Sequence, residues 1–230
     1  MTADRSAHNR HSIRNPEYDY ASAGAYFVTI CTRGRECLLH ARAVRGIITD
    51  VWHALPSWFP TIALDEFVVM PNHVHSIIWL QSSKPVGATH AIDPDTGAAP
   101  PVGATHAVAR HAVDHGATGD SKTREWLVPP PTTRKPYPRL GDVIGTFKSL
   151  VFAVYLEWIE QHEPTRRAKF WQRNYYEHVI RDNEELQAIR RYIMANPAGW
   201  QIDRDNPSNM RHAAAPTRIE DYLGEIGHSG

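Results

Sequence analysis

Runs of β-branched and aromatic residues along the chain predict four β-strands. Three of these runs are bounded by glycine, proline or asparagine, and they cover residues 25–32, 62–69 and 73–80. Pro71 and Asn72 supply turn chemistry between the second run and the third. A shorter run at residues 174–180 is the fourth candidate strand.

Apolar residues at helical spacing predict three helices between and after these strands. The first helix has its apolar stripe at residues 44–55. Two prolines are expected to end this helix, Pro56 and Pro60. The second helix covers residues 140–159. The third begins behind the N-cap candidates Asp182 and Asn183 and is expected to stop at Pro197.

The resulting order of elements, β-α-β-β-α-β-α, predicts an α+β fold. It corresponds to a ferredoxin-like split βαβ unit with an antiparallel sheet, helices on one face, and an added C-terminal helix. This last helix carries Tyr192, a candidate catalytic residue.

A low-complexity insertion interrupts the predicted domain at about residues 82–138. The sequence Pro-Val-Gly-Ala-Thr-His-Ala at residues 85–91 recurs at residues 101–107, and a run of three prolines follows. Segments so rich in Gly, Ala and Pro bury little apolar surface, so we expect this one to be mostly disordered. The predicted organisation is an N-terminal tail, an interrupted catalytic domain and a C-terminal tail, at residues 1–24, 25–200 and 201–230.

Composition narrows the class of protein. With 230 residues and 42% hydrophobic residues, the chain can form one domain, and its apolar runs are too short to span a membrane. Only two cysteines and no apolar leader segment point to the cytoplasm. A formal net charge of zero excludes a nucleic-acid binder that is basic throughout, although residues 134–173 hold eight basic and four acidic residues.

Two pairs of polar residues are candidates for chemistry. On a strand, His73 and His75 point to the same face with their Cβ atoms roughly 6.6 Å apart, so both can bind one cation. On a helix, Tyr192 and Asn196 share a face because they are four residues apart. Taken alone, each pair also fits a plain structural role, as surface or core histidines and as a half-buried tyrosine beside a capping asparagine.

An aromatic cluster at residues 170–176 is a candidate surface for nucleic acid. Aromatic rings stack on unpaired bases, and arginine contacts phosphate or base edges. The same rings would equally suit a strand that closes the core, and two of them, Tyr175 and Tyr176, compete with Tyr192 for any tyrosine chemistry. The predicted DNA-binding residues are Arg14, Lys148, Trp171, Gln172, Arg173, Asn174, Tyr175 and Tyr176.

The order of several motifs makes the prediction more specific. These motifs lie at residues 26–32, 70–76, 145–149, 171–178 and 192–197. Together they resemble the single-tyrosine HUH transposases of the insertion-sequence-200-like group, and most of all the REP-associated tyrosine transposases. The resemblance covers roughly residues 11–81 and 139–200.

This resemblance implies roles for individual residues. His73 and His75 match the metal-binding HUH pair, and Tyr192 matches the nucleophile of the C-terminal helix. Asn196 stands where the wider family carries a polar metal ligand, often Gln. The implied cofactor is a divalent metal ion, Mg²⁺ or Mn²⁺.

The implied activity is nicking and strand transfer of single-stranded DNA next to a hairpin, through a 5′-phosphotyrosine intermediate. Such a protein would act as a monomer or homodimer, with no membrane partner. Two alternatives remain open at this point. One is a domesticated protein that binds hairpin DNA without transposing it, and the other is a metal-dependent phosphodiesterase in which Tyr192 is only structural.

Overall fold

The structure is a computed structural model that describes residues 22–81, 137–165, 169–203 and 205–209. Its strands are β1 Gly24–Cys31, β2 Ile62–Val69, β3 His73–Leu80 and β4 Tyr176–Ile180. Its α-helices are α1 Arg42–Trp58, α3 Leu140–His162 and α4 Asn183–Gly199. Three short 3₁₀ turns complete it, η1 Arg33–Arg35, η2 Leu38–His40 and η3 Trp200–Ile202. Arg14, most of the predicted insertion and most of both predicted tails lie outside the described residues.

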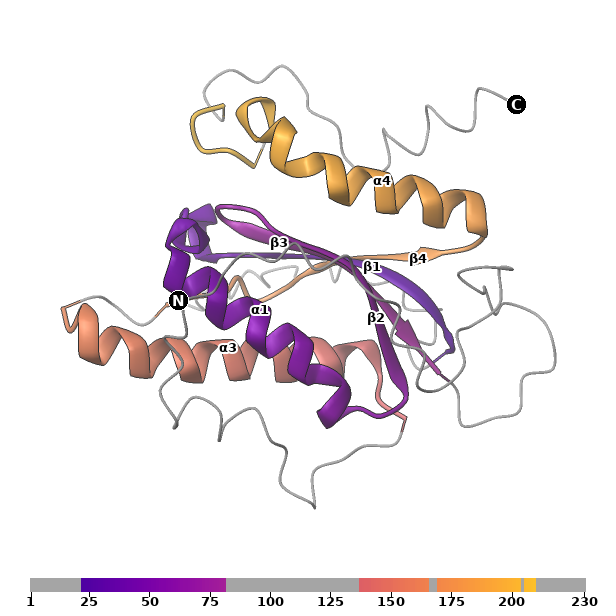
Figure 1. The fold of residues 1–230 in the computed structure, drawn as a ribbon, viewed down its shortest axis with the longest axis horizontal. Helices are drawn as coiled ribbons and strands as arrows, with labels where there is room; N and C mark the ends of the chain where they lie inside the picture. The colour runs from indigo at the N-terminus through magenta and orange to yellow at the C-terminus, as the bar shows by residue number, and fades with distance from the viewer. Residues whose placement is uncertain (1–21, 82–136, 166–168, 204, 210–230) are drawn as a thin grey trace, which may run out of the picture.

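The four strands form one antiparallel sheet in the order β2-β3-β1-β4 (Figure 1). The two central strands are the first and the third of the sequence, so each βαβ crossover skips over one strand. This is the split βαβ arrangement, and it confirms the predicted ferredoxin-like α+β fold. Residues 62–69 and 73–80 form strands with the predicted bounds.

Helices cover both faces of the sheet. Helices α1 and α3 lie side by side on one face, and α4 lies alone on the other (Figure 1). Along β3, Val74 and Ile78 pack toward α1 and α3, whereas Ile77 and Trp79 pack in a second cluster with α4. The added C-terminal helix thus turns the two-layer prediction into three layers, and every residue of β3 is buried as a result.

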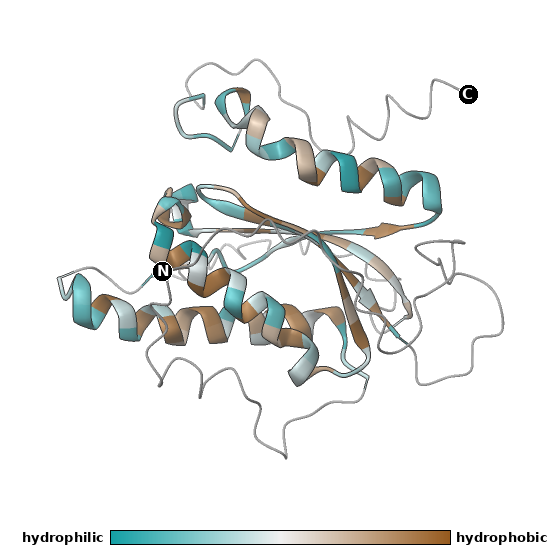
Figure 2. Cartoon of the chain, viewed as in Figure 1, coloured by the Kyte–Doolittle hydropathy of each residue, from teal (hydrophilic) through white to brown (hydrophobic). Residues whose placement is uncertain are grey.

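Helix α4 is amphipathic, with one apolar face packed on the sheet. Its colouring in Figure 2 alternates between hydrophilic and hydrophobic positions along its length. The predicted N-cap is confirmed, because the Asp182 carboxylate accepts a hydrogen bond of 2.8 Å from the Glu185 N–H. None of the helices in the described ranges combines the length and the apolar composition needed to cross a bilayer.

Two predicted helix ends were wrong. Pro56 lies inside α1 and Pro197 lies inside α4, although both were expected to end their helices. Each proline lies in the last turn of its helix, where its missing N–H removes one hydrogen bond, and only two residues follow it before the helix ends. Helix α3 also runs three residues past its predicted end, and β4 begins two residues later than predicted.

Asp65, at a bulge in β2, links α4 to the sheet. The pairing of β2 with β3 shifts between Leu64 and Phe67, and this irregularity accompanies a turn of Asp65 toward α4. The Asp65 carboxylate accepts two hydrogen bonds from the Arg190 guanidinium, at 2.9 and 2.7 Å, and one from the Trp79 indole at 2.8 Å. The helix that carries Tyr192 is therefore held by a bidentate ion pair as well as by apolar packing.

Candidate active site

The two histidines of β3 face each other on the side of the sheet that α4 covers. His73 and His75 are buried, at 1% and 4% exposure. Because successive strand residues alternate faces, both rings point to the layer of Ile77 and Trp79. Their Nε2 atoms are 3.0 Å apart.

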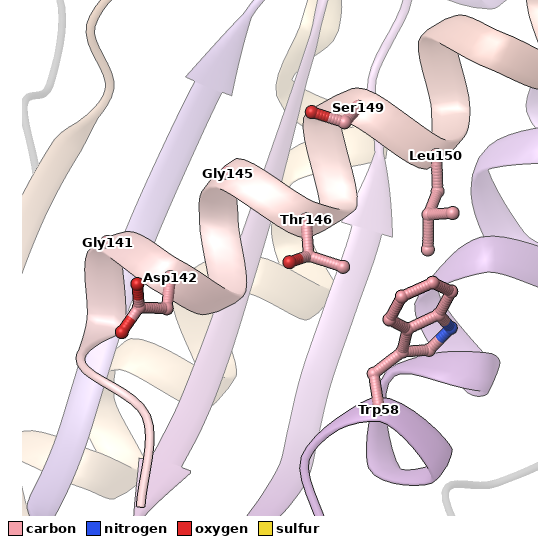
Figure 3. A pocket seen from close by; sticks show the side chains of 7 residues that line it. All are labelled: Trp58, Gly141, Asp142, Gly145, Thr146, Ser149 and Leu150. Atoms are coloured by element: carbon pink, nitrogen blue, oxygen red, sulfur yellow. The ribbon is translucent and has the colours of Figure 1, made fainter. Parts of the chain in front are cut away.

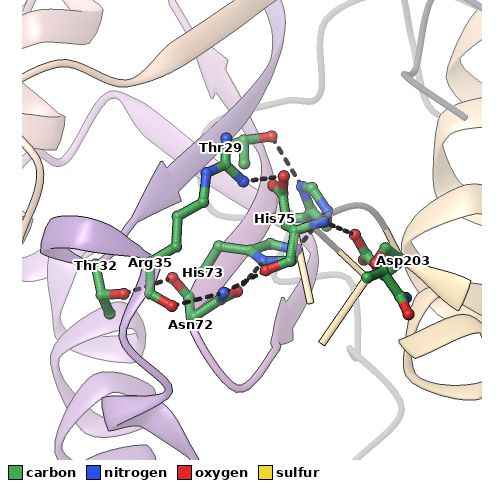
Figure 4. Close-up of polar contacts among 9 residues, drawn as sticks. Thr29, Thr32, Arg35, Asn72, His73, His75 and Asp203 are labelled. Atoms are coloured by element: carbon green, nitrogen blue, oxygen red, sulfur yellow. Dashed lines mark hydrogen bonds and ion pairs between the residues drawn. The ribbon is translucent and has the colours of Figure 1, made fainter. Parts of the chain in front are cut away.

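The other ring nitrogen of each histidine is held by a polar side chain (Figure 4). His73 Nδ1 lies 2.8 Å from Asn72 Oδ1. His75 Nδ1 lies 2.8 Å from the Thr29 hydroxyl, which comes from the neighbouring strand β1. Phe27, two residues earlier on β1, stacks on the His75 ring with 5.4 Å between ring centroids. In metal sites, hydrogen-bond partners of this kind fix the orientation of the imidazole that binds the metal.

Both imidazoles are neutral at physiological pH. Burial lowers the pKa of His75 from 6.5 to about 3. Burial also lowers the pKa of His73 well below 6.5, and the nearby His75 and Arg35 lower it further. A neutral imidazole has one nitrogen lone pair, so each ring can serve as a metal ligand.

These lowered pKa values predict a pH-dependent stability of the metal-free protein. Unfolded histidine has a pKa near 6.5, so below that pH the unfolded chain binds a proton that folded His75 does not. The free energy of unfolding should fall as pH decreases below about 6.5, by up to about 1.4 kcal/mol per pH unit from His75. Urea denaturation at several pH values between 7 and 5, in the presence of a chelator, would measure this free energy of unfolding. A His75→Gln variant should show a shallower slope, and an unchanged slope would contradict the prediction.

Tyr192 reaches the histidine pair from α4. Its ring centroid lies 5.3 Å from that of His75, and it meets the edge of Phe27 at 6.0 Å. Tyr192 is half-buried and packs at the edge of the buried stripe of Ile189 and Ile193. The structure thus brings the strand-borne imidazole pair and the helix-borne phenol together.

Tyr176 lies close to the same cluster. It pairs with Thr29 across β1 and β4, and its ring is 6.2 Å from the ring of Phe27. Phe27 therefore has a tyrosine from α4 and a tyrosine from β4 as neighbours. Tyr175 points the other way and packs against the core under α1 and α3.

Asn196 follows Tyr192 by one helical turn and is buried at 8% exposure. Its Nδ2 lies 3.3 Å from the carbonyl of Tyr192, to which it donates. Asn196 was predicted at the end of the helix, but it lies inside α4 because the helix continues through Pro197. Asn196 therefore does not cap the helix and instead lies on the buried face of α4.

The donor set at the histidine pair fits a divalent cation. Two nitrogen ligands that bind an octahedral ion at about 2.1 Å and about 90° to each other lie about 3.0 Å apart. That is the separation of the two Nε2 atoms. Among the described residues, no group of three or more His, Cys, Asp or Glu side chains is arranged to hold a metal. A third protein ligand from this part of the chain would have to be of another type, such as the amide of Asn196.

The predicted DNA-binding residues of 171–176 lie at the end of the sheet where the histidines are found. Trp171 forms an isolated antiparallel β-bridge with Thr32, the residue that follows β1. The Gln172 N–H donates a hydrogen bond of 2.9 Å to the Cys31 carbonyl. Cys31 in turn pairs with His73 across the sheet. Trp171 packs partly against the core, whereas Arg173 and Asn174 are exposed.

Lys148 supports this segment from α3. Its ammonium group donates to the backbone carbonyls of Gln172, at 2.5 Å, and Arg173, at 3.1 Å. Burial lowers the pKa of Lys148 from 10.5 to about 8. In the structure Lys148 thus holds the loop before β4, and its predicted contact with DNA stays a prediction.

A cluster of residues beside His73 was not predicted from the sequence. Arg35 forms an ion pair with Asp205, and Trp200 lies 6.2 Å from His73 between ring centroids. Arg35 and the preceding Gly34 have positive φ values of 56° and 64°. This conformation is uncommon for a residue other than glycine, so tertiary contacts must hold it.

A separate hollow lies in the layer of α1 and α3 (Figure 3). It has a volume of about 380 Å³ and is lined by Trp58 of α1 and one side of α3. The lining includes Gly145, which begins one of the motifs noted in the sequence. Since this layer covers the face opposite α4, the hollow is not part of the histidine–tyrosine site.

Fold and site together define the class of protein: a ferredoxin-like α+β domain whose sheet presents a buried histidine pair to a tyrosine on its last helix. No protein-family model matches the chain. A protein of Haemophilus influenzae, described as uncharacterized, is 30% identical over 205 residues, which are 86% of this chain and 93% of that protein. The chain belongs to the same family as this protein.

Two solved structures are similar at low identity. One is a REP-associated tyrosine transposase bound to a REP hairpin, with 15% identity, 89% of each chain covered and a TM-score of 0.44. The other is a suggested transposase from Deinococcus radiodurans, with 14% identity, 79% of this chain and 95% of that chain covered, and a TM-score of 0.36. The function is inferred from the chain's own residues.

Proposed function

We propose that this protein is a metal-dependent enzyme that nicks and rejoins single-stranded DNA next to a hairpin, with Tyr192 as the nucleophile. The observation that carries this proposal is the ring contact of 5.3 Å between Tyr192 and His75, whose Nε2 lies 3.0 Å from that of His73. A phenol beside two neutral imidazoles suits phosphoryl transfer with a bound cation. The order of the sequence motifs, which resembles the single-tyrosine HUH transposases, supports the same activity.

The residues have distinct roles in the proposed reaction. His73, His75 and Asn196 would hold a divalent cation, Mg²⁺ or Mn²⁺, which when bound polarises a non-bridging oxygen of the scissile phosphate. The Tyr192 hydroxyl attacks phosphorus and loses its proton. The bond from phosphorus to the 3′-oxygen breaks, and that oxygen leaves as a 3′-hydroxyl. A 5′-phosphotyrosine remains, and attack by another 3′-hydroxyl reverses the step without an external energy source.

Packing orients the tyrosine for this reaction. Tyr192 lies against Phe27, and Asp65 holds Arg190 two residues before it on α4. Such positioning of a nucleophile contributes to rate because the reacting atoms need little further ordering. We further propose that Trp171, Arg173 and the neighbouring residues of 171–176 bind the unpaired bases and the backbone of the DNA. The protein would carry out this reaction as a monomer or homodimer.

The test is a search for a covalent protein–DNA adduct. Full-length protein is incubated with Mn²⁺ and single-stranded DNA that contains a hairpin and a ³²P label at its 3′ end, downstream of the cut, and is then run on a denaturing gel. We expect labelled protein that survives denaturation and is lost in Tyr192→Phe, because phenylalanine keeps the ring and lacks the nucleophilic oxygen.

Tyr176→Phe is the matched control, since it removes the same atom from the other tyrosine that neighbours Phe27. It should retain the adduct, because phenylalanine keeps the ring with which residue 176 is proposed to stack on a base. An adduct lost only in Tyr176→Phe would mean that the wrong tyrosine was chosen. Cleavage without an adduct would favour a phosphodiesterase, and binding without cleavage would favour a protein that only recognises hairpins.

A further inference from the structure

We propose that Asn72 is a positioning residue that holds His73 in the tautomer with its proton on Nδ1 and so presents the Nε2 lone pair to the cation. The proposal rests on the proposed function for the role of the cation. The tautomer itself follows from contacts of Asn72 that do not depend on that function.

The orientation of the Asn72 amide is fixed by two backbone carbonyls. The residue is completely buried. Its Nδ2 lies 3.0 Å from the carbonyl oxygen of Arg35 and 2.5 Å from that of Asp205. Carbonyl oxygens only accept hydrogen bonds, so they require the NH₂ group on that side. A flipped amide would place Oδ1 against two oxygens and lose both hydrogen bonds.

The amide is also anchored through its neighbours. The Arg35 guanidinium is ion-paired with the Asp205 carboxylate, so the two residues that supply the carbonyls are themselves linked. The backbone carbonyl of Asn72 accepts a hydrogen bond of 2.8 Å from the N–H of Thr32. Both the main chain and the side chain of Asn72 are therefore held in place.

This orientation determines where the proton of His73 lies. Asn72 Oδ1 is 2.8 Å from His73 Nδ1 and has no hydrogen to donate. His73 Nδ1 must therefore be the donor. Because a neutral imidazole carries one N–H, the Nε2 of His73 is left with its lone pair, directed at the other histidine.

His75 is held in a different way. Its Nδ1 faces the Thr29 hydroxyl, which can donate or accept. Without metal, His75 Nε2–H donates to His73 Nε2 at 3.0 Å, and the Thr29 hydroxyl donates to His75 Nδ1. To hold a cation through Nε2, His75 would carry its proton on Nδ1, and the Thr29 hydroxyl would then accept a hydrogen bond from that N–H. The pair thus consists of one ligand with a fixed tautomer and one with an adaptable tautomer.

Nitrogen-15 NMR of the imidazoles in the metal-free, full-length protein tests the inference. We expect His73 to be protonated on Nδ1 in the wild type and to become a mixture of tautomers in Asn72→Ala. Affinity for Mn²⁺ alone, measured by calorimetry, should fall about tenfold or more in this variant, as is usual when a partner of a metal-ligating histidine is removed.

Asn206→Ala is the matched control. Asn206 is also buried, and its Nδ2 donates to the Trp200 carbonyl at 3.0 Å while its Oδ1 accepts from the Ser208 N–H, so it makes these bonds without a histidine. This variant should keep the wild-type tautomer and affinity. Thr29→Val is a second variant, and it should alter the spectrum of His75 while His73 stays protonated on Nδ1.

Two results would overturn the inference: a wild-type His73 protonated on Nε2, or a folded Asn72→Ala with unchanged tautomer and unchanged Mn²⁺ affinity. The wild-type spectrum decides the tautomer even if Asn72→Ala does not fold. A wild type with His73 protonated on Nδ1 that fails to bind Mn²⁺ would instead overturn the proposed metal-dependent function, so the two failures can be told apart.

Discussion

His75→Ala is expected to abolish Mn²⁺-dependent cleavage of single-stranded hairpin DNA, with a loss of at least about a thousandfold in rate. The imidazole is one of two nitrogen donors that lie 3.0 Å apart, and a cation held by the remaining histidine would be bound weakly. Stabilisation by a metal ion contributes several kcal/mol to such reactions, and each 1.4 kcal/mol changes the rate about tenfold. Single-turnover cleavage of labelled DNA measures this loss.

DNA affinity should change little in His75→Ala, because the buried imidazole is not among residues 171–176, which we expect to bind the DNA. His162→Ala is a suitable control, since His162 is an exposed histidine at the end of α3. It should cleave like the wild type. Metal-dependent nicking that persists in a folded His75→Ala protein would rule out the assigned ligand pair.

Asp65→Ala is expected to lower the free energy of unfolding by about 3 kcal/mol, because it removes one member of a largely buried ion pair. The carboxylate accepts from both Arg190 and Trp79, so its loss leaves a guanidinium and an indole N–H without their acceptor. Urea denaturation monitored by tryptophan fluorescence provides the measurement. Since this pair joins β2 to α4, the rate of DNA cleavage should fall as well.

Glu66→Ala is the matched control for this variant. Glu66 is the next carboxylate of the same strand, and burial together with repulsion from Asp65 raises its pKa. Because its charged form is disfavoured in the folded protein, its removal should change stability by no more than about 0.5 kcal/mol. Equal losses in the two variants would show that the Asp65–Arg190 pair does not hold α4 to the sheet.

The strands and the placement of the candidate site could be predicted from local sequence patterns. A strand places residues two apart on one face, so the shared direction of His73 and His75 follows from the strand alone. A helix places Tyr192 beside the stripe of Ile189 and Ile193, so a half-buried phenol also follows. Neither pattern predicts which face of the sheet the last helix covers, because that depends on the direction in which the chain turns after β4.

Other features depend on contacts between distant parts of the chain. Asn72 was interpreted as a turn residue, yet its side chain donates to carbonyls 37 and 133 positions away. Arg35 adopts a positive φ that its own residue type disfavours. Pro56 and Pro197 misled the prediction because a proline removes only its own N–H hydrogen bond to the preceding turn, so a helix can still continue for two residues beyond it.

The hydrogen bond from Asn72 to the Asp205 carbonyl determines how far the C-terminal part of the chain can be shortened. The chain from residue 201 on was predicted to be a tail, and in the structure Asp205 contacts the folded part through Asn72 and Arg35. A version truncated directly after α4 would leave one amide proton beside His73 without its acceptor. Any shortened protein prepared for metal-binding or cleavage measurements should therefore extend at least to residue 209.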